Sequence, residues 1–267
     1  MQTKTTIKQM HLHLLRHPGE HGFEPVHPYT FRGFLLDIIK DVDPRLAASL
    51  HDEQGIKPYA IQYVVKDLEI LLTVNLFTTS IHKALYSYFT AIQDATVNIG
   101  KAKCSLYRVK MNEINYRDLL EQSTPVDGCK IEFRTPAYFN SSSHDFNIKL
   151  PIPGLLFKNL AQMWNEFTGH QVDLDVDGFL DWITKNADVS SFEIKTFPFT
   201  LGKGRNISGV KGWIRLRLGR SEVGYNRWVD CLLKLAQYTN VGGNRTAGMG
   251  SIKYNPNQPR AERAWDT

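Results

Sequence analysis

Cysteines are few in this sequence, and long hydrophobic runs are absent. Its 267 residues include only three cysteines, Cys104, Cys129 and Cys231, which lie far apart. Their number and spacing fit neither a disulfide framework nor a zinc site, which favours a reducing compartment. No segment approaches the ~20 apolar residues of a membrane span, and no apolar run near the N-terminus is long enough for a signal peptide. We therefore expect a soluble, cytoplasmic protein without a membrane partner.

The glycine-rich stretch 241–250 matches neither of the common nucleotide-binding motifs. It holds four glycines but lacks the Gly-Lys-Ser/Thr ending of a P-loop and the glycine spacing of a dinucleotide-binding turn. Two explanations stay open. The glycines can form a tight connection between a helix and a strand. Alternatively, exposed N–H groups of the turn can bind an anion, with Arg245 as a cation that matches phosphate geometry.

The charge balance favours a polyanionic partner. The formal net charge is +5 and the sequence pI is about 9.0, while 42% hydrophobic and 22% charged residues are ordinary for a globular protein. Five of the nine histidines, at positions 11, 13, 17, 21 and 27, lie close together. Because no cysteine or zinc motif accompanies them, an RNA-facing or surface role is favoured over a metal site. His82 is expected at the surface of a helix.

Hydrophobic periodicity predicts the order β-α-β-β-α-β in residues 1–113, which is that of a ferredoxin-like unit. Alternating apolar positions predict strands, whereas apolar residues at intervals of three and four predict helices. The expected strands are 6–15, 59–65, 69–77 and 103–112. The expected helices are 30–42, a short one that Asp43 caps and that ends near residue 52, and 79–92.

The same order returns after a polar linker at 114–128. The expected elements are a strand at 129–139, a helix at 153–167, a hairpin of 192–201 with 210–218, a helix at 225–238 and a strand at 251–254. Residues 129–255 would then form a second unit, and 256–267 a flexible tail. The predicted fold class is α+β, with two tandem ferredoxin-like (βαββαβ) units of the RAMP or RRM type.

Several segments of the second unit together resemble one family. The helix 225–238, the glycine-rich stretch and the following strand resemble the C-terminal signature of the RAMP-type RNA-binding proteins of CRISPR systems. They are most similar to the Cas6 family, the endoribonucleases that process CRISPR repeat transcripts. Further matches are the strand ending in Thr135-Pro136, the segment Pro151-Ile152-Pro153 leading to Met163-Trp164-Asn165, and the strand beginning Gly209-Val210-Lys211-Gly212-Trp213.

The resemblance covers most of residues 129–254, and in the N-terminal half mainly Leu50-His51 and Lys57-Pro58. It implies a metal-independent endoribonuclease that cuts CRISPR precursor transcripts within their repeats to give crRNAs. Attack by a 2′-hydroxyl would leave a 2′,3′-cyclic phosphate and a 5′-hydroxyl. No metal or cofactor is implied. The implied partners are CRISPR repeat RNA, crRNA and the subunits of a CRISPR effector complex.

An RNase of this kind needs side chains that move protons and stabilise charge. Histidine suits proton transfer near neutral pH, and lysine can stabilise a phosphorane. Family members carry a histidine after the first helical segment, often a lysine downstream, and in some cases a tyrosine. The resemblance thus implies His51, Lys57 and Tyr29 as catalytic residues, with Tyr59 in reserve. The competing explanations are a structural histidine, a solvated lysine and a half-buried helix-start aromatic.

Alternation along 211–218 predicts a strand with one basic and one apolar face. The basic face would carry Lys211, Trp213, Arg215 and Arg217, extended by Lys203, Arg205, Arg220 and Arg227. The competing explanation is a solvated sheet edge. In the family, this hairpin and the glycine-rich stretch engage the repeat RNA. The resemblance therefore implicates Lys203, Arg205, Lys211, Arg215, Gly242, Gly243, Asn244, Arg245 and Thr246.

Two other functions compete with cleavage. A non-catalytic RAMP subunit that binds crRNA in an effector complex would share the fold and the glycine-rich stretch but needs no histidine, so the position of His51 favours the enzyme. A generic RNA-binding ferredoxin-like protein is disfavoured, because no aromatic strand of the RNP1 type is visible.

Overall fold

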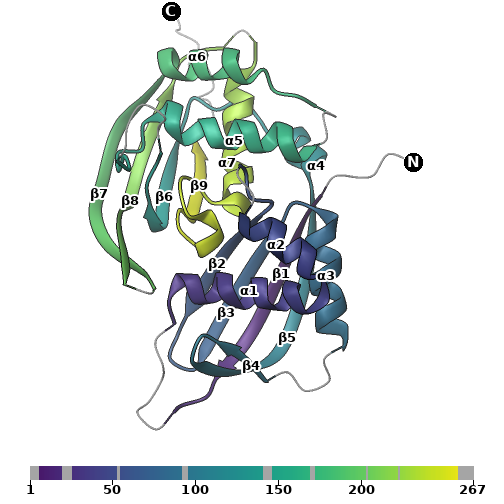
Figure 1. The fold of residues 1–267 in the computed structure, drawn as a ribbon. Coiled ribbons are helices and arrows are strands. Elements are labelled where there is room, and N and C mark those ends of the chain that lie inside the picture. The colour runs from purple at the N-terminus through teal and green to yellow at the C-terminus, as the bar shows by residue number, and fades with distance from the viewer. Residues whose placement is uncertain are drawn as a thin grey trace, which may run out of the picture. The chain divides into compact units, whose positions relative to one another are not determined.

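The computed structural model describes residues 6–19, 26–52, 55–91, 96–140, 146–168, 172–202, 204–221 and 223–257. The chain divides into two compact units (Figure 1). The first comprises residues 1–116, 198–208 and 244–249, and the second comprises 117–197, 209–243 and 250–267. No helix within the described ranges is long and apolar enough to cross a membrane.

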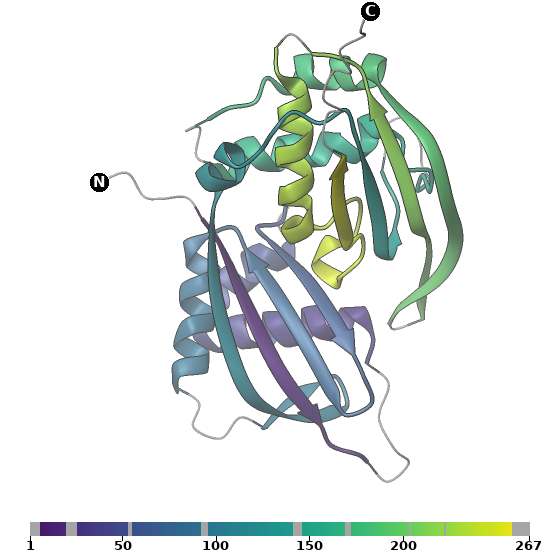
Figure 2. The same ribbon diagram turned by 180° about the vertical axis from the view of Figure 1, so that it is seen from behind.

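The first unit is an antiparallel sheet covered by helices on one face. Its strands are β1 (Thr6–Arg16), β2 (Tyr59–Val65), β3 (Glu69–Leu76), β4 (Thr96–Ile99) and β5 (Ala102–Asn115), in the order β2-β3-β1-β5-β4. The helices are α1 (Pro28–Val42), α2 (Pro44–Asp52) and α3 (Thr79–Ala91). Apart from the short β4, which was not expected, this is the predicted ferredoxin-like arrangement. Figure 2 shows the sheet from the face that the helices leave open.

Alternation along β1 explains how this unit forms its core. Met10, Leu12 and Leu14 are buried at 1% exposure or less, and they pack with the apolar stripe of α1, including Phe31 and Leu35. The expected N-cap of α2 is confirmed. The Asp43 carboxylate accepts from the N–H groups of Arg45 at 3.1 Å and Leu46 at 3.0 Å.

The second unit has the same topology. Its strands are β6 (Gly128–Ala137), β7 (Ala187–Gly202), β8 (Arg205–Leu218) and β9 (Ile252–Asn257), in the order β7-β8-β6-β9. Its helices are α5 (Pro153–Thr168), α6 (Val176–Asn186) and α7 (Tyr225–Thr239), followed by the 3₁₀ turn η1 (Arg245–Ala247), which belongs to the first unit. Two aromatic pairs pack edge to face in its helical layer, Trp164 with Trp228 and Phe157 with Phe179.

Several boundaries differ from the sequence expectation. Within 114–128, the expected linker, β5 continues to Asn115 and α4 covers Tyr116–Glu121. Helix α6 was not expected, and β7 begins at Ala187 rather than 192. Strand β9 continues to Asn257, so it includes the first two residues of the expected tail, and 258–267 lie outside the described residues.

Candidate active site and RNA-facing surfaces

A pocket of about 800 Å³ lies between α1 and α2 in the first unit. It exists because the facing positions of both helices are small. Gly33, Pro44, Ala47 and Ala48 line it, and a Cβ at residue 33 would meet no atom within 4 Å. The pocket is therefore a gap between two packed helices that side chains at its rim can reach into.

Two of the three expected catalytic residues line this pocket together. His51 is in the last turn of α2 and is exposed, and Tyr29 is the second residue of α1 and is half-buried. They are 22 positions apart in the sequence, yet the turn at Asp43 brings α2 back along α1. An imidazole and a phenol thus share one cavity.

Lys57 has a different position. Its ammonium donates to the Leu50 carbonyl oxygen at 3.1 Å, which ties the chain after α2 to the residue before His51. Lys57 is not among the residues that line the pocket. Tyr59 is fully buried, and burial raises its pKa, while the nearby Arg32 and Thr246 side chains oppose that rise. A buried phenol cannot touch an RNA, so Tyr59 is excluded as the second acid/base.

Sequence reasoning missed three charged residues of the pocket. Arg32, Asp37 and Lys40 line it from α1. With Tyr29 they recur at helical intervals of three to five, on the face opposite the apolar stripe. That polar stripe is the signal that could have revealed them, although on a single helix it is indistinguishable from a solvated face. Two cations and one carboxylate leave the pocket wall net positive.

The glycine-rich stretch is a compact turn, and most of its main-chain N–H groups donate to main-chain carbonyls of the protein. Gly242 has a φ of 73° and Gly250 a φ of 70°, where a Cβ would overlap the carbonyl oxygens of Tyr138 and Val241. Six N–H groups donate to main-chain carbonyls: Val241 to Gly250, Gly243 to Tyr138, Ala247 and Met249 to Asn244, Gly248 to Arg245, and Gly250 to Pro136. These groups are not available to an anion, so the geometry favours a tight connection over a glycine nest.

Two side chains of the turn face outward in part. Asn244 adopts the left-handed conformation (φ 51°), and its amide nitrogen is buried without a hydrogen-bond partner among the described residues. Arg245 beside it is half-buried, and burial lowers the pKa of its guanidinium to about 10, which leaves it cationic at neutral pH. Thr246 is 7% exposed and lies toward Tyr59. An unsatisfied donor and a cation are thus adjacent.

The predicted two faces of β8 are confirmed. Ile214, Leu216 and Leu218 are buried, whereas Arg215 and Arg217 are exposed and the remaining two residues of the basic face are half-buried. Arg217 forms an exposed ion pair with Asp188 at 3.9 Å. Lys203 lies outside the described residues, as does the side chain of Arg205, whose backbone begins β8.

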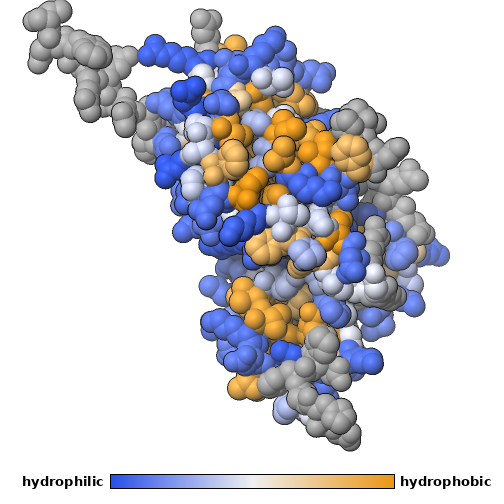
Figure 3. Space-filling view, turned by 90° about the vertical axis from the view of Figure 1, so that its left-hand side faces the viewer, coloured by the Kyte–Doolittle hydropathy of each residue, from blue (hydrophilic) through white to orange (hydrophobic). Residues whose placement is uncertain are grey.

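Two cations lie near the indole of Trp213, and its N–H donates to the Glu193 carboxylate at 3.3 Å. Lys130 of β6, opposite Arg215 in the ladder, places its ammonium 4.6 Å from the ring centroid, and the Arg215 guanidinium is at 5.8 Å. Lys211 lies 5.7 Å from the ring of Phe197, which is 41% exposed. Sequence reasoning missed Lys130 because it lies on another strand. Figure 3, which faces the β7 side, shows hydrophobic side chains set among hydrophilic ones.

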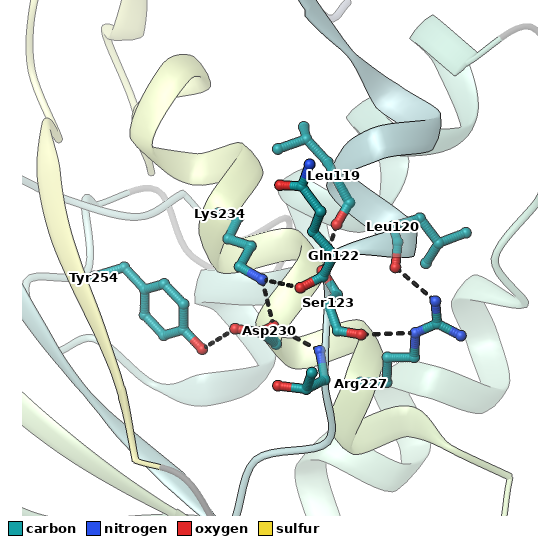
Figure 4. A network of polar contacts seen from close by, with 9 residues as sticks. Leu119, Leu120, Gln122, Ser123, Arg227, Asp230, Lys234 and Tyr254 are labelled. Carbon is teal, nitrogen blue, oxygen red and sulfur yellow. Dashed lines mark hydrogen bonds and ion pairs between the residues drawn. The ribbon is translucent and has the colours of Figure 1, made fainter.

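Arg227, expected on the basic surface, is engaged inside the second unit (Figure 4). Its guanidinium donates to the carbonyl oxygens of Ser123 at 3.0 Å and Leu120 at 2.7 Å. One turn later, the Asp230 carboxylate accepts from Tyr254 at 2.6 Å and from the Lys234 ammonium at 2.8 Å. These contacts anchor the segment after α4 to α7, so Arg227 has a structural role.

The histidine-rich segment shows no metal site in the part of the chain that is described. There, no group of three or more His, Cys, Asp or Glu side chains is arranged to hold an ion. His11 instead contacts the hydroxyl of Thr73 at 3.0 Å, and His17 that of Ser105 at 2.7 Å; His21 lies outside the described residues. His82, expected at the surface, is half-buried, and burial lowers its pKa.

Comparison with known proteins agrees with these features. Residues 131–252 match the family model of the CRISPR-associated endoribonuclease Cas6. A Cas6 endoribonuclease of Streptococcus thermophilus is 24% identical over 226 residues, which cover 84% of this chain and 89% of that protein. Two solved structures share the fold: a Cas6 product complex, with a TM-score of 0.77 and 19% identity, and a Cas6 substrate mimic complex, with 0.75 and 18%. Each match covers 94% of this chain, and 99% and 100% of the other chains. Over residues 131–252 and in its fold, this chain is therefore similar to the Cas6 endoribonucleases.

Proposed function

We propose that this protein cuts CRISPR precursor transcripts within their repeats and so releases crRNAs. The observation that carries the proposal is the pocket that His51 and Tyr29 share with Arg32 and Lys40, in a chain whose residues 131–252 match the model of an endoribonuclease family. Cleavage of a phosphodiester without a metal requires side chains that transfer protons and cations that stabilise negative charge. The pocket holds two of each.

The reaction is an internal transfer at phosphorus. A 2′-hydroxyl loses its proton to a base, its oxygen attacks the adjacent phosphorus, the bond to the 5′-oxygen breaks, and that oxygen receives a proton. The products are a 2′,3′-cyclic phosphate and a 5′-hydroxyl. We assign the acid/base role to His51 and a second proton-transfer or positioning role to Tyr29. Arg32 and Lys40 stabilise the charge that grows on the phosphorane.

Lys57 acts through His51 in this scheme. Its bond to the Leu50 carbonyl holds the end of α2, and His51 is the next residue along the chain. The reaction is most productive when the attacking oxygen, phosphorus and leaving oxygen lie in line, so a rigid α2 terminus matters as much as the imidazole itself. No metal or cofactor enters the scheme.

The RNA-binding role falls to the basic face of β8 and to the side chains of Asn244 and Arg245. Lys211, Arg215 and the indole of Trp213 offer cations and an aromatic surface. The hairpin residues Lys203 and Arg205 extend this set. Retention of the crRNA on this surface would let the protein enter an effector complex.

The three cysteines are buried and free, which fits a protein of the reducing cytoplasm.

Cleavage of a cognate repeat RNA in EDTA tests the proposal. Wild type should cut, whereas His51→Ala should lose about 10²–10⁴-fold in rate with little change in binding. A substrate with a 2′-deoxy group at the cut should stay intact. The matched control is His17→Ala, another exposed histidine, which should cut like wild type. Tight binding by a wild type that never cuts would instead identify a non-catalytic RAMP subunit that holds crRNA.

A further inference from the structure

The sheet of the first unit has an open face that the helices do not cover (Figure 2). Because side chains alternate along a strand, Gln9, His11 and His13 of β1 point away from the buried Met10, Leu12 and Leu14. The ladder places a residue of β3 on one side of each of the three and a residue of β5 on the other. These partners are Asn75 and Asn112 for Gln9, Thr73 and Lys110 for His11, and Leu71 and Arg108 for His13.

The part of this open face around Gln9 and His11 is a hydrogen-bonded polar network. Gln9 donates to Asn75 at 2.9 Å, and the two ring nitrogens of His11 lie 3.0 Å from Thr73 and Gln9. The Asn112 amide is 3.2 Å from His11. Thr73 and Asn75 are themselves buried, so the network fixes the half-buried Gln9 and His11, and binding would not first have to order these two side chains.

A bulge brings an aromatic ring to the same face. The register of β1 with β5 shifts between His13 and Leu14, which leaves Tyr107 as the extra residue. A bulge can re-aim a side chain, and here the Tyr107 ring lies 5.9 Å from that of His13. Tyr107 is 56% exposed. The row then continues through Leu71 to Val64 of β2.

Among the described residues, Arg108 and Lys110 of this face have no acidic partner. Arg108 and Lys110 are exposed, and within the described ranges neither forms an ion pair. Lys8 on the same sheet, in contrast, is paired with Glu113. Two unpaired cations beside an exposed tyrosine and a histidine offer charge to phosphates and ring surface to bases. A protein partner would fit less well, because half of the face is polar and already hydrogen-bonded.

We propose that this open face binds single-stranded RNA, at a site separate from the pocket of His51. Bases stack on Tyr107 and His13, phosphates lie against Arg108 and Lys110, and the face takes about two or three nucleotides, as sheet surfaces of this size do. The inference rests on the proposed function, because the bound RNA is a part of the transcript that is not being cut. It gives the histidines of β1 a role in RNA binding.

A fluorescein-labelled oligouridine of about ten nucleotides is a suitable probe for such a site. Tyr107→Ala should weaken its binding about tenfold through the lost stacking. Joint replacement of Arg108 and Lys110 by alanine should flatten the dependence of log Kd on log salt by about 1.4, since each single-strand phosphate contact contributes about 0.7. With 5-iodouridine in the probe, the crosslink should map to residues 102–115.

The chain supplies a matched control. Tyr86 of α3 is 51% exposed and lies 6.0 Å from the His82 ring, so Tyr86→Ala removes an equivalent ring from the helical face. It should bind the probe like wild type, and Tyr107→Ala should still cut a short repeat hairpin at the wild-type rate. Unchanged binding by Tyr107→Ala, or equal weakening by Tyr86→Ala, would overturn this inference alone. Failure of wild type to cut would overturn the proposed function instead.

Discussion

Asp230→Ala should destabilise the second unit far more than loss of an equivalent exposed residue. Asp230 is 1% exposed, and its carboxylate accepts from Lys234, from the Tyr254 hydroxyl and from the Thr124 N–H at 2.9 Å (Figure 4). Alanine would remove this acceptor from the Tyr254 hydroxyl, whose residue is 7% exposed, whereas the N–H of the exposed Thr124 can bond to water instead. Lys234 is 28% exposed and keeps the Gln122 carbonyl, so it loses less.

The size of the effect follows from these contacts. An unsatisfied buried donor costs about 1–3 kcal/mol, and removal of one partner of a buried ion pair costs about 3–5 kcal/mol. We therefore expect the free energy of unfolding of this unit to fall by about 3–5 kcal/mol. The control is Asp181→Ala. Asp181 and Lys185 have the same i,i+4 spacing and a 2.7 Å contact, but both side chains are more than 60% exposed. That pair should contribute at most about 0.5 kcal/mol.

Urea unfolding followed by tryptophan fluorescence measures this unit separately. All five tryptophans lie beyond residue 116, so the signal does not report on the first unit. Asp230→Ala should lower the urea midpoint strongly at an unchanged slope, and Asp181→Ala should barely move it. Equal, small shifts for the two variants would refute the view that burial gives the Asp230 contacts their strength.

Two further predictions concern the glycine-rich turn and the open sheet face. Gly242→Ala should destabilise the second unit by about 1–3 kcal/mol in the same urea assay, because positive φ and the Tyr138 carbonyl oppose a Cβ. The control in the same unit is Gly154→Ala in α5, where a Cβ would meet Thr184 Oγ1 at an ordinary 3.5 Å; it should be neutral or stabilising. Burial, then Lys110 and His13, lower the pKa of His11 below 6.5, which NMR titration should show. Because the pKa of His11 is lower in the folded state than in the unfolded state, the free energy of unfolding should decrease as the pH falls through 6.5. His11→Gln should show a smaller decrease over the same pH range.

Local patterns predicted the framework of the fold well. The alternation along β1 and β8 and the apolar stripe of α1 each follow from burial of one face, which is a property of the element itself. Helix α6 was missed although Val176, Phe179, Leu180 and Ile183 have the i, i+3, i+4, i+7 spacing of an amphipathic helix, because the segment between the expected helix 153–167 and the expected strand 192–201 was given no element. Its start depends on one local contact, in which the Asp175 carboxylate accepts from the Gly178 N–H at 3.1 Å.

The candidate site was predictable only in part, for a different reason. His51 and Tyr29 were named through family resemblance, whereas Arg32 and Lys40 acquire meaning only when α2 packs beside α1 and closes a pocket over them. Likewise Lys130 joins Trp213 only through the pairing of β6 with β8. Such groupings depend on contacts between elements, and the spacing of residues within one element does not contain them.

In the glycine-rich turn, side chains rather than main-chain N–H groups are left for contacts with RNA. Each of its four glycines is required by close packing, since a Cβ would overlap Tyr138 at Gly242 and Gly243, the Tyr63 ring at Gly248, and the Val241 carbonyl at Gly250. With six N–H groups already donating inside the protein, the main chain has little left for a phosphate. What the turn leaves partly exposed are the side chains of Asn244 and Arg245, although the amide nitrogen of Asn244 itself is buried. The glycines therefore serve to hold two side chains in place, and recognition of RNA by this turn depends on those side chains.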